Sequence, residues 1–377
     1  MATISAMLSR RTFFKTTGIG AAVAATASLS ELFTWAEPSR APDPSGRILL
    51  NSNENAYGPF PSVVALANPY QGFNRYPDRH SDLVLERLAA KHKVEPEGVI
   101  VGCGSTEILR IAANAFIGPG RKLVMASPTF EAMGGYAAAV GAPVVKVPLA
   151  ANFTHNLGAM LEAAGSDAGL VYICNPNNPT GNITPRADLE KFIAGLPKNT
   201  RVLMDEAYHD FVPAGQDYTS FLDRPMPDGR IIVARTFSKV YGLAGMRLGY
   251  GIADKDTSAE MRKHRLFDST NVCVLRCALM SLDDSNAHRI AVDRNAADRD
   301  EFMRQAAARK LEPIPSSTNF VMMETGRPIR GLLEYFDRNG IKIGRPFPPL
   351  DKYARISLGT PPEMKEFWRV WDGLPKA

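Results

Sequence analysis

The sequence predicts an α/β protein, in which helices flank a mainly parallel sheet and a smaller α+β domain completes the chain. Two observations support this fold class. Between residues 81 and 252, short apolar, β-branched runs alternate with longer helical segments, the pattern of strands joined by crossover helices. After residue 254 longer helices and then short strands replace this alternation, which indicates a separate α+β region.

Each expected strand is a short apolar run that ends in a polar or glycine-containing turn. We expect strands at residues 49–50, 99–101, 123–125, 144–147, 170–173, 202–204, 231–234 and 248–252. Helices are expected at 81–91 with Ser81 as the N-cap, at 108–116, from Phe130 to Ala139, and at 185–196, where a proline opens the helix. Later elements are helices between 255 and 307, strands at 319–323, 342–343 and 354–357, and a terminal helix at 363–371.

This pattern divides the chain into four expected segments. Residues 1–36 form a leader that we exclude from the fold. Residues 37–65 form an N-terminal arm that contributes to the small domain. Residues 66–265 form the large, ligand-binding domain, and residues 266–377 form the small C-terminal domain.

The leader carries a charged segment followed by a weakly apolar one. Arg10, Arg11 and Lys15 surround Phe13 and Phe14, and a small-residue run follows to residue 29. This arrangement resembles a twin-arginine export signal, with possible cleavage motifs at 34–36 and 25–27. It predicts export to the periplasm, and a cytoplasmic location is the alternative.

Composition argues against several other functions. The net charge of +5 over 377 residues is small and lacks long basic runs, so nucleic acid is not an expected partner. No segment beyond the leader is apolar enough to span a membrane. Of the four cysteines, Cys273 and Cys277 lie four apart in an expected helix, without partners for a metal. We expect neither a metal site nor a disulfide framework.

Polar motifs follow the ends of several expected strands. They are Gly104-Ser105-Thr106, Phe130, Asn178, Asp205 with Tyr208, and the run from Thr236 through Ser238 and Lys239 to Arg247. Because the carboxyl ends of parallel strands meet at one edge, these groups should surround one ligand.

Pyridoxal phosphate is a cofactor that would use all of these groups. Its aldehyde needs a lysine, for which Lys239 is the candidate, and its protonated ring nitrogen needs a buried carboxylate, for which Asp205 is suitable. Asn178 and Tyr208 are available for the phenolic oxygen, and Phe130 for the ring face. The phosphate would be bound by the helix start and by hydroxyl and guanidinium groups: Gly104, Ser105, Thr106, Thr236, Ser238 and Arg247.

Residues 49–360 resemble the fold-type I, class I and II pyridoxal-phosphate aminotransferases, and most closely the histidinol-phosphate aminotransferase group. The motifs are the stretch from Asn175 to Gly181, Asp205 to Tyr208, and Ser238-Lys239 with Arg247. The resemblance implies an aspartate-aminotransferase-like large domain with a seven-stranded type of sheet. It implies a Lys239 aldimine, with Lys239, Asp205 and Tyr208 as the catalytic residues. It also implies a homodimer with shared active sites, in which Tyr76 reaches the phosphate of the neighbouring subunit.

The resemblance implies ping-pong transamination between an amino acid, or a histidinol-phosphate-like amino-alcohol phosphate, and a 2-oxo acid such as 2-oxoglutarate. Arg355 would bind the α-carboxylate, and Tyr57, Asn178 and Arg345 would complete the substrate site. The segment around Arg345 departs from the family pattern, as do Thr106 and Phe130. Two alternatives stay open: another pyridoxal-phosphate enzyme, such as an amino-acid-phosphate decarboxylase, and a non-catalytic ligand-binding homologue.

Overall fold

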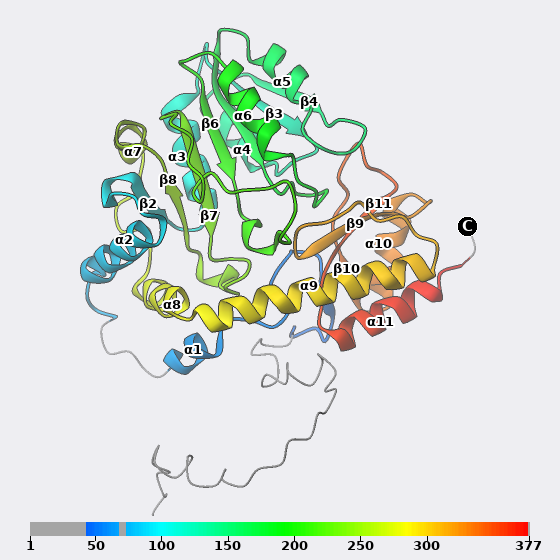
Figure 1. Cartoon of the computed structure of the whole chain (residues 1–377). Helices are drawn as coiled ribbons and strands as arrows, with labels where there is room; N and C mark the ends of the chain where they lie inside the picture. The colour runs from blue at the N-terminus through cyan, green and yellow to red at the C-terminus, as the bar shows by residue number, and fades with distance from the viewer. Residues whose placement is uncertain (1–42, 68–72, 376–377) are drawn as a thin grey trace, which may run out of the picture. The chain divides into compact units, whose positions relative to one another are not determined.

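The computed structural model describes residues 43–67 and 73–375, so the expected leader at 1–36 lies outside the described residues. Within them the largest element is a seven-stranded sheet with the order β2-β8-β7-β6-β5-β3-β4 (Figure 1). β8 runs antiparallel to both of its neighbours, and the other strand pairs are parallel. The predicted mainly parallel sheet is confirmed. Its strands are Val99–Gly102 (β2), Lys122–Ser127 (β3), Val144–Pro148 (β4), Ala168–Cys174 (β5), Arg201–Asp205 (β6), Ile231–Thr236 (β7) and Gly249–Ile252 (β8).

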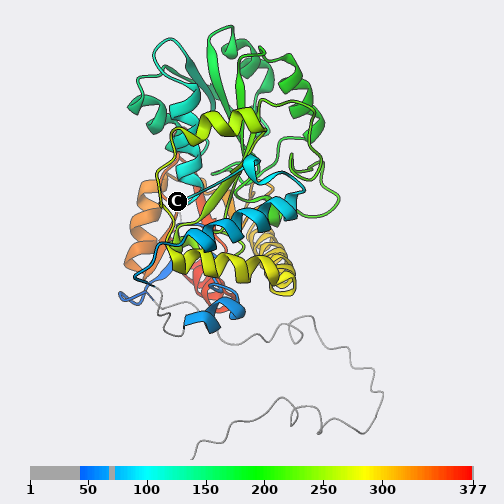
Figure 2. The same ribbon diagram turned by 90° about the vertical axis from the view of Figure 1, so that its left-hand side faces the viewer.

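Helices cover this sheet because each has an apolar stripe to bury. α3 (Ser105–Phe116), α4 (Ala132–Ala139) and α7 (Lys255–Arg262) share one hydrophobic cluster with Tyr172 of β5 and Leu203 of β6. α5 (Leu157–Ala164) packs against α6 (Arg186–Gly195) and against β3 and β4. Figure 2 shows this layered arrangement from the side. Cys174, the last residue of β5, belongs to this cluster and Phe130 packs against it, so the cluster extends to the strand ends that carry polar motifs.

Two separate two-stranded sheets lie outside the seven-stranded sheet. β1 (Ile48–Leu50) pairs in parallel with β10 (Ile341–Ile343), and β9 (Phe320–Glu324) pairs antiparallel with β11 (Tyr353–Ser357). α9 (Ser285–Ala308), α10 (Ile329–Arg338) and α11 (Pro361–Asp372) contribute to a hydrophobic cluster with these strands. In this cluster the rings of Phe336 and Phe367 are stacked, with their centres 5.2 Å apart. The β1–β10 pairing places the loop after residue 50 beside the segment after residue 343.

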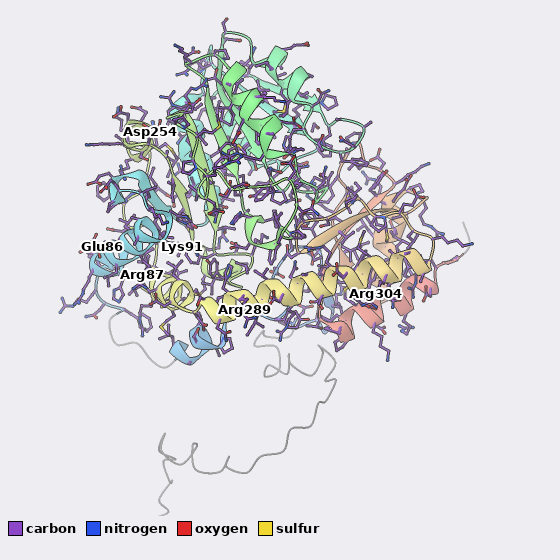
Figure 3. All side chains as sticks on the ribbon, in the orientation of Figure 1. Glu86, Arg87, Lys91, Asp254, Arg289 and Arg304 are labelled. Carbon is purple, nitrogen blue, oxygen red and sulfur yellow. The ribbon has the colours of Figure 1, made fainter. Side chains whose placement is uncertain are left out.

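The outer faces of the helices carry charges rather than candidate site residues. Arg87 on α2 (Asp78–His92) pairs with Asp283 of α8 (Val272–Asp283), and Arg289 and Arg304 form ion pairs within α9 (Figure 3). Exposed pairs of this kind each contribute roughly 0–1 kcal/mol to folding. None of the helices among the described residues combines the length and apolar character needed to cross a membrane.

Some predicted helix boundaries were wrong. α2 begins at Asp78 rather than at Ser81, with Pro77 at the N-cap, because the fixed φ of proline suits a helix start. α3 begins at Ser105 rather than at residue 108, since the turn at Gly104 takes a φ of 81° and lets the helix start directly after β2. α1 (Pro61–Val64), α5 and α10 had no counterpart among the predicted elements.

Candidate active site

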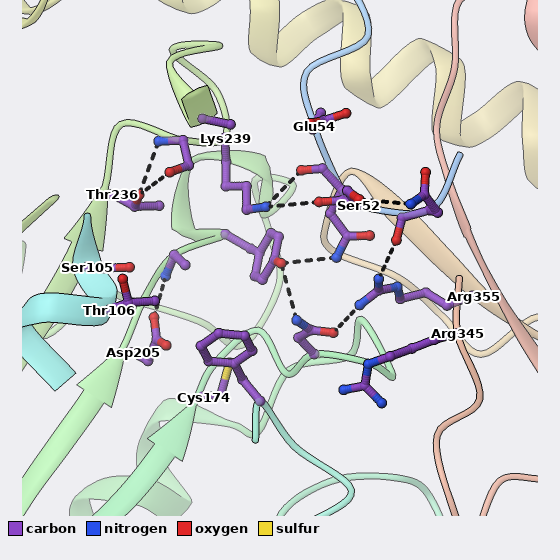
Figure 4. A pocket seen from close by; sticks show the side chains of 18 of the residues that line it. Ser52, Glu54, Ser105, Thr106, Cys174, Asp205, Thr236, Lys239, Arg345 and Arg355 are labelled. Atoms are coloured by element: carbon purple, nitrogen blue, oxygen red, sulfur yellow. Dashed lines mark hydrogen bonds between the residues drawn. The ribbon is translucent and has the colours of Figure 1, made fainter. Parts of the chain in front are cut away.

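The carboxyl ends of β5, β6 and β7 open onto a cavity of about 590 Å³ (Figure 4). The loop after β1 and the segment after β10 contribute the remaining lining. The structure therefore brings most of the predicted site residues together: Ser105, Thr106, Phe130, Asn178, Asp205, Tyr208, Thr236, Ser238, Lys239, Arg247, Arg345 and Arg355. These residues come from both the large sheet and the small sheets.

Lys239 follows β7 by three residues and lines the cavity. Its Nζ donates hydrogen bonds to the carbonyl oxygens of Asn53 at 2.9 Å and Ser52 at 3.5 Å. Burial, with a smaller contribution from the nearby guanidinium of Arg355, lowers the pKa of the Lys239 ammonium to about 8. Near neutral pH the neutral amine, which a nucleophile or a base requires, is therefore a far larger fraction than for an ordinary lysine.

Asp205 is the last residue of β6 and is 3% exposed. Its Oδ2 accepts a hydrogen bond from the hydroxyl of Tyr172 at 2.8 Å, and its Oδ1 accepts one from the N–H of Ala207 at 3.1 Å. Burial raises the pKa of the Asp205 carboxyl to about 6, although both hydrogen bonds act in the opposite direction. Among the described residues Asp205 has no ion-pair partner, so its environment suits a cationic group of a ligand, such as a protonated ring nitrogen.

An anion site lies at the start of α3. The N-terminal N–H groups of that helix, the hydroxyl of Thr106 and the guanidinium of Arg247 converge there, with Arg247 Nη2 3.4 Å from Thr106 Oγ1. Arg247 Nη1 also lies 3.4 Å from Ser238 Oγ, which accepts a hydrogen bond from Thr236 Oγ1 at 2.9 Å.

Gly104 makes this close approach possible. A Cβ at that position would lie 2.2 Å from Arg247 Nη2, and the φ of 81° is one that other residues rarely adopt. The cradle therefore fits a phosphate, and the whole site fits the expected cofactor.

Tyr208 and Arg355 form the opposite wall with two asparagines. The Tyr208 hydroxyl accepts from Asn53 Nδ2 at 3.1 Å and from Asn178 Nδ2 at 3.5 Å. Arg355 donates from Nη1 to Asn178 Oδ1 and from Nη2 to the carbonyl of Asn51, both at 2.7 Å. Its buried Nε has no hydrogen-bond partner among the described residues. Burial lowers the pKa of Arg355 to about 10, so the side chain stays cationic at neutral pH and can bind a carboxylate.

Arg345 lies at the solvent side of the cavity, and its side chain is 50% exposed. Its Nη2 pairs with Glu131 Oε2 at 2.7 Å, and its guanidinium lies 4.3 Å from the ring centre of Phe347. Phe130 also lines the cavity, and a flat ligand could stack on its ring.

The structure does not bring Tyr57 and Tyr76 to this cavity. Tyr57 donates to Asp298 Oδ2 of α9 at 2.9 Å, and the guanidinium of Arg294 lies 4.0 Å over its ring. Tyr76 is 79% exposed and lines a separate surface groove with Phe73. In the described part of the chain, neither tyrosine is among the residues that line the cavity.

Sequence reasoning missed several lining residues. Asn51, Ser52, Asn53 and Glu54 line the cavity, although their polar sequence predicts only a turn after the strand at 49–50. The signal was the Asn-rich run itself, and Asn53 adopts a positive φ of 53° that asparagine tolerates better than most residues. Cys174 also lines the cavity, at the buried end of β5.

Comparison with known proteins gives a consistent result. Residues 45–370 match the family model for aminotransferase class I and II. The histidinol-phosphate aminotransferase of Moorella thermoacetica is 34% identical over 326 residues, which cover 86% of this chain and 84% of that protein. Histidinol-phosphate aminotransferase 2 of Ralstonia nicotianae is 37% identical, with 84% and 85% covered. The crystal structure of the Sinorhizobium meliloti histidinol-phosphate aminotransferase in complex with pyridoxal-5'-phosphate has a TM-score of 0.79 at 28% identity, covering 87% of this chain and 92% of that one.

Proposed function

The chain belongs to the aminotransferase class I and II family, and from this premise we propose a substrate pair and a role for each residue of the cavity. It is a pyridoxal-phosphate-dependent aminotransferase. The amino donor in our proposal is a histidinol-phosphate-like amino-alcohol phosphate or an amino acid. The acceptor is a 2-oxo acid such as 2-oxoglutarate. The relatives named above support this choice of donor.

One observation carries the proposal: a single cavity is lined by the buried Lys239 amine, by the buried Asp205 carboxylate and by an anion cradle at Arg247. The same cavity is lined by the guanidinium of Arg355, whose Nε has no hydrogen-bond partner among the described residues. When bound, pyridoxal phosphate supplies an aldehyde for the donor amine and a ring that takes up the electrons of the broken bond. The cradle of Ser105, Thr106, Thr236, Ser238 and Arg247 would hold its phosphate, and Asp205 its ring nitrogen. Asn178 and Tyr208 would donate to its phenolic oxygen, and Phe130 would cover its ring.

Lys239 moves the proton in this proposal. Its Nζ would take the proton from the α-carbon of the donor and would deliver a proton again when the product forms. The low pKa of the Lys239 ammonium keeps part of the amine neutral and ready to accept that proton. The carbonyl of Asn53, 2.9 Å from Nζ, would help to orient the amine. In the second half-reaction the same atom moves the proton in the reverse direction.

The two arginines of the cavity provide the substrate contacts. Arg355, with its unpartnered Nε, would bind the carboxylate of the 2-oxo acid, while Asn178 holds its Nη1 in place. Arg345, which is half-exposed, would bind the terminal anionic group of the donor after leaving Glu131. Tyr57 would act indirectly, since its hydroxyl ties the loop that carries Asn53 and Glu54 to Asp298.

A panel of amino donors tests this assignment. Histidinol phosphate, aromatic amino acids and acidic amino acids are each mixed with the holoenzyme and 2-oxoglutarate, and glutamate formation is measured. We expect phosphorylated amino alcohols to have the highest kcat/KM. If histidinol phosphate gives no glutamate while another donor does, the proposed donor is wrong and the aminotransferase activity stands.

We also propose a homodimer with shared active sites. Phe73, Tyr76, Leu266 and Phe267 expose 64%, 79%, 56% and 90% of their surfaces, and Phe73 and Tyr76 line one groove with Asp268 and Thr270. A second copy of the chain would cover this apolar surface. Tyr76 would then reach the phosphate cradle of the neighbouring subunit.

Hybrid dimers test that role for Tyr76. Tyr76→Ala and Lys239→Ala subunits are mixed under conditions that exchange subunits. If Tyr76 acts across the interface, one site of each hybrid contains both native residues, and activity rises above that of either parent. If Tyr76 acts within its own chain, mixing restores no activity.

We further propose that residues 1–36 direct twin-arginine export to the periplasm, after the folded enzyme has bound its cofactor. We also propose that residues 37–65 form an arm that contributes to the small domain, that residues 66–265 form the large domain, and that residues 266–377 form the small C-terminal domain. Fractionation of cells that express the native chain and an Arg10→Lys, Arg11→Lys variant tests the export signal. Equal periplasmic amounts of the two proteins would refute it.

A further inference from the structure

Tyr172 is a buried tyrosine that neither lines the cavity nor belongs to the predicted site. It lies in the middle of β5 and is 0% exposed. In the β5–β6 ladder Cys174 lies opposite Asp205 and Tyr172 lies opposite Leu203. All four side chains point to one face of the sheet, since side chains two apart on a strand share a face. The Tyr172 hydroxyl therefore extends diagonally past Cys174 and meets Asp205 Oδ2 at 2.8 Å.

The Asp205 carboxylate accepts one hydrogen bond from a side chain among the described residues, and Tyr172 donates it. Oδ1 accepts from the N–H of Ala207, and Oδ2 accepts from Tyr172. The thiol of Cys174 is directed to the carbonyl of Pro176 at 3.4 Å instead. In the part of the chain that the structure describes, no lysine or arginine forms an ion pair with Asp205. One backbone donor and one side-chain donor thus stabilise a carboxylate that is almost fully removed from water.

We propose that Tyr172 is a positioning residue that keeps the shared proton on the ring nitrogen of the cofactor rather than on Asp205. This inference rests on the proposed placement of that nitrogen against Asp205. A proton between a carboxylate and a pyridine nitrogen moves toward the stronger base. A hydrogen bond to the carboxylate stabilises its charge and weakens it as a base. Tyr172 therefore favours the protonated ring, which is the form that accepts electrons.

Burial alone would have the opposite effect. It raises the pKa of the Asp205 carboxyl, and the hydrogen bond from Tyr172 is the largest influence that lowers it. Burial and the nearby Asp205 raise the pKa of the Tyr172 hydroxyl well above its ordinary value, so it stays a donor at any working pH. Since β5 and β6 are adjacent strands and their residues 168–174 and 202–205 are buried, the geometry of this contact is fixed by the sheet.

The test observes the ring nitrogen directly. Holoenzyme is prepared with cofactor labelled at the ring nitrogen, and the nitrogen resonance is measured for wild type, Tyr172→Phe and Tyr250→Phe. Tyr250→Phe is the matched control, because it removes another buried hydroxyl, bonded to His92 Nε2 at 3.0 Å on β8. We expect a protonated-ring shift in wild type and in the control, and a move toward the neutral-ring shift in Tyr172→Phe. An unchanged resonance in Tyr172→Phe overturns the proposal.

Two further measurements keep the result interpretable. A ring-fluorinated tyrosine at position 172 retains the shape and is a stronger donor, so the resonance should keep the protonated-ring shift of wild type. A move toward the neutral-ring shift contradicts the proposal even if Tyr172→Phe folds poorly. For Tyr172→Phe we expect kcat to fall about fivefold with little change in KM, as loss of about 1 kcal/mol of hydrogen-bond energy in the transition state gives. If wild type shows a neutral ring, the placement against Asp205 fails as well.

Discussion

The two sides of the cavity are built differently. The sheet side consists of residues at consecutive strand ends of one sheet: Ser105, Thr106, Asp205, Thr236, Ser238, Lys239 and Arg247. The arginine side consists of segments about 300 residues apart in sequence: 51–54, Arg345 and Arg355. The sheet side lies on the continuous ladder of one seven-stranded sheet, whereas the arginine side is assembled from two short two-stranded ladders and from side-chain contacts such as Arg355 with Asn178. We therefore expect changes on the sheet side to affect the chemistry and changes on the arginine side to affect substrate binding.

Replacing Lys239 tests the sheet side with the largest effect. Lys239→Ala should lower kcat by about a thousandfold or more, because a general base contributes roughly 10²–10⁴-fold. Folding should be almost unaffected, which circular dichroism will show. Lys191→Ala, an exposed lysine on α6, is the matched control and should keep full activity. Retained turnover in Lys239→Ala would mean that another residue moves the proton.

Asp205→Asn tests the sheet side through the pH dependence of the free energy of unfolding. In the cofactor-free protein burial raises the Asp205 pKa to about 6, above its ordinary value of 3.8. Its stabilising contribution is therefore present below pH 3.8 and is lost as the pH rises through 6. At pH 8 the cofactor-free Asp205→Asn protein should be up to about 3 kcal/mol more stable than wild type. Denaturant unfolding from pH 4 to pH 8 measures this, and a pH-independent difference would contradict it. In the same variant we expect cofactor affinity to fall.

Arg355→Lys tests the arginine side. The lysine keeps the charge and loses the planar fork that contacts Asn178 and Asn51. We expect the KM for 2-oxoglutarate to rise about 30-fold, in line with about 2 kcal/mol for a hydrogen bond to a charged group. Cofactor affinity should stay the same, since the sheet side is intact. If cofactor affinity fell by the same factor as the KM for 2-oxoglutarate rises, the two sides of the cavity would not have separate roles.

Glu131→Gln should have the smallest effect. Its pair with Arg345 is at least half-exposed on both partners, so stability should change by less than about 1 kcal/mol. The freed Arg345 should lower the KM for a phosphorylated donor a few-fold at low salt. Steady-state kinetics at two ionic strengths will measure this. A raised KM would indicate that Glu131 contributes to donor binding rather than competing with it.

The sheet side was largely predictable from sequence because its signals are local. An apolar run followed by Asp205, or by Thr236 to Lys239, places those groups at one sheet edge once the strands are parallel. The arginine side was less predictable, because the loop at Asn53 approaches Lys239 and Tyr208 only after β1 pairs with β10. Tyr172 could not be recognised in advance, since a tyrosine inside a buried strand has the same pattern as a core residue.

Chemical trapping of the holoenzyme tests whether this cavity binds pyridoxal phosphate through Lys239. The enzyme is treated with borohydride, digested and analysed by mass spectrometry. We expect a phosphopyridoxyl adduct on the peptide containing Lys239, and loss of the adduct in Lys239→Ala. An adduct on a different lysine, or none on Lys239, would contradict it.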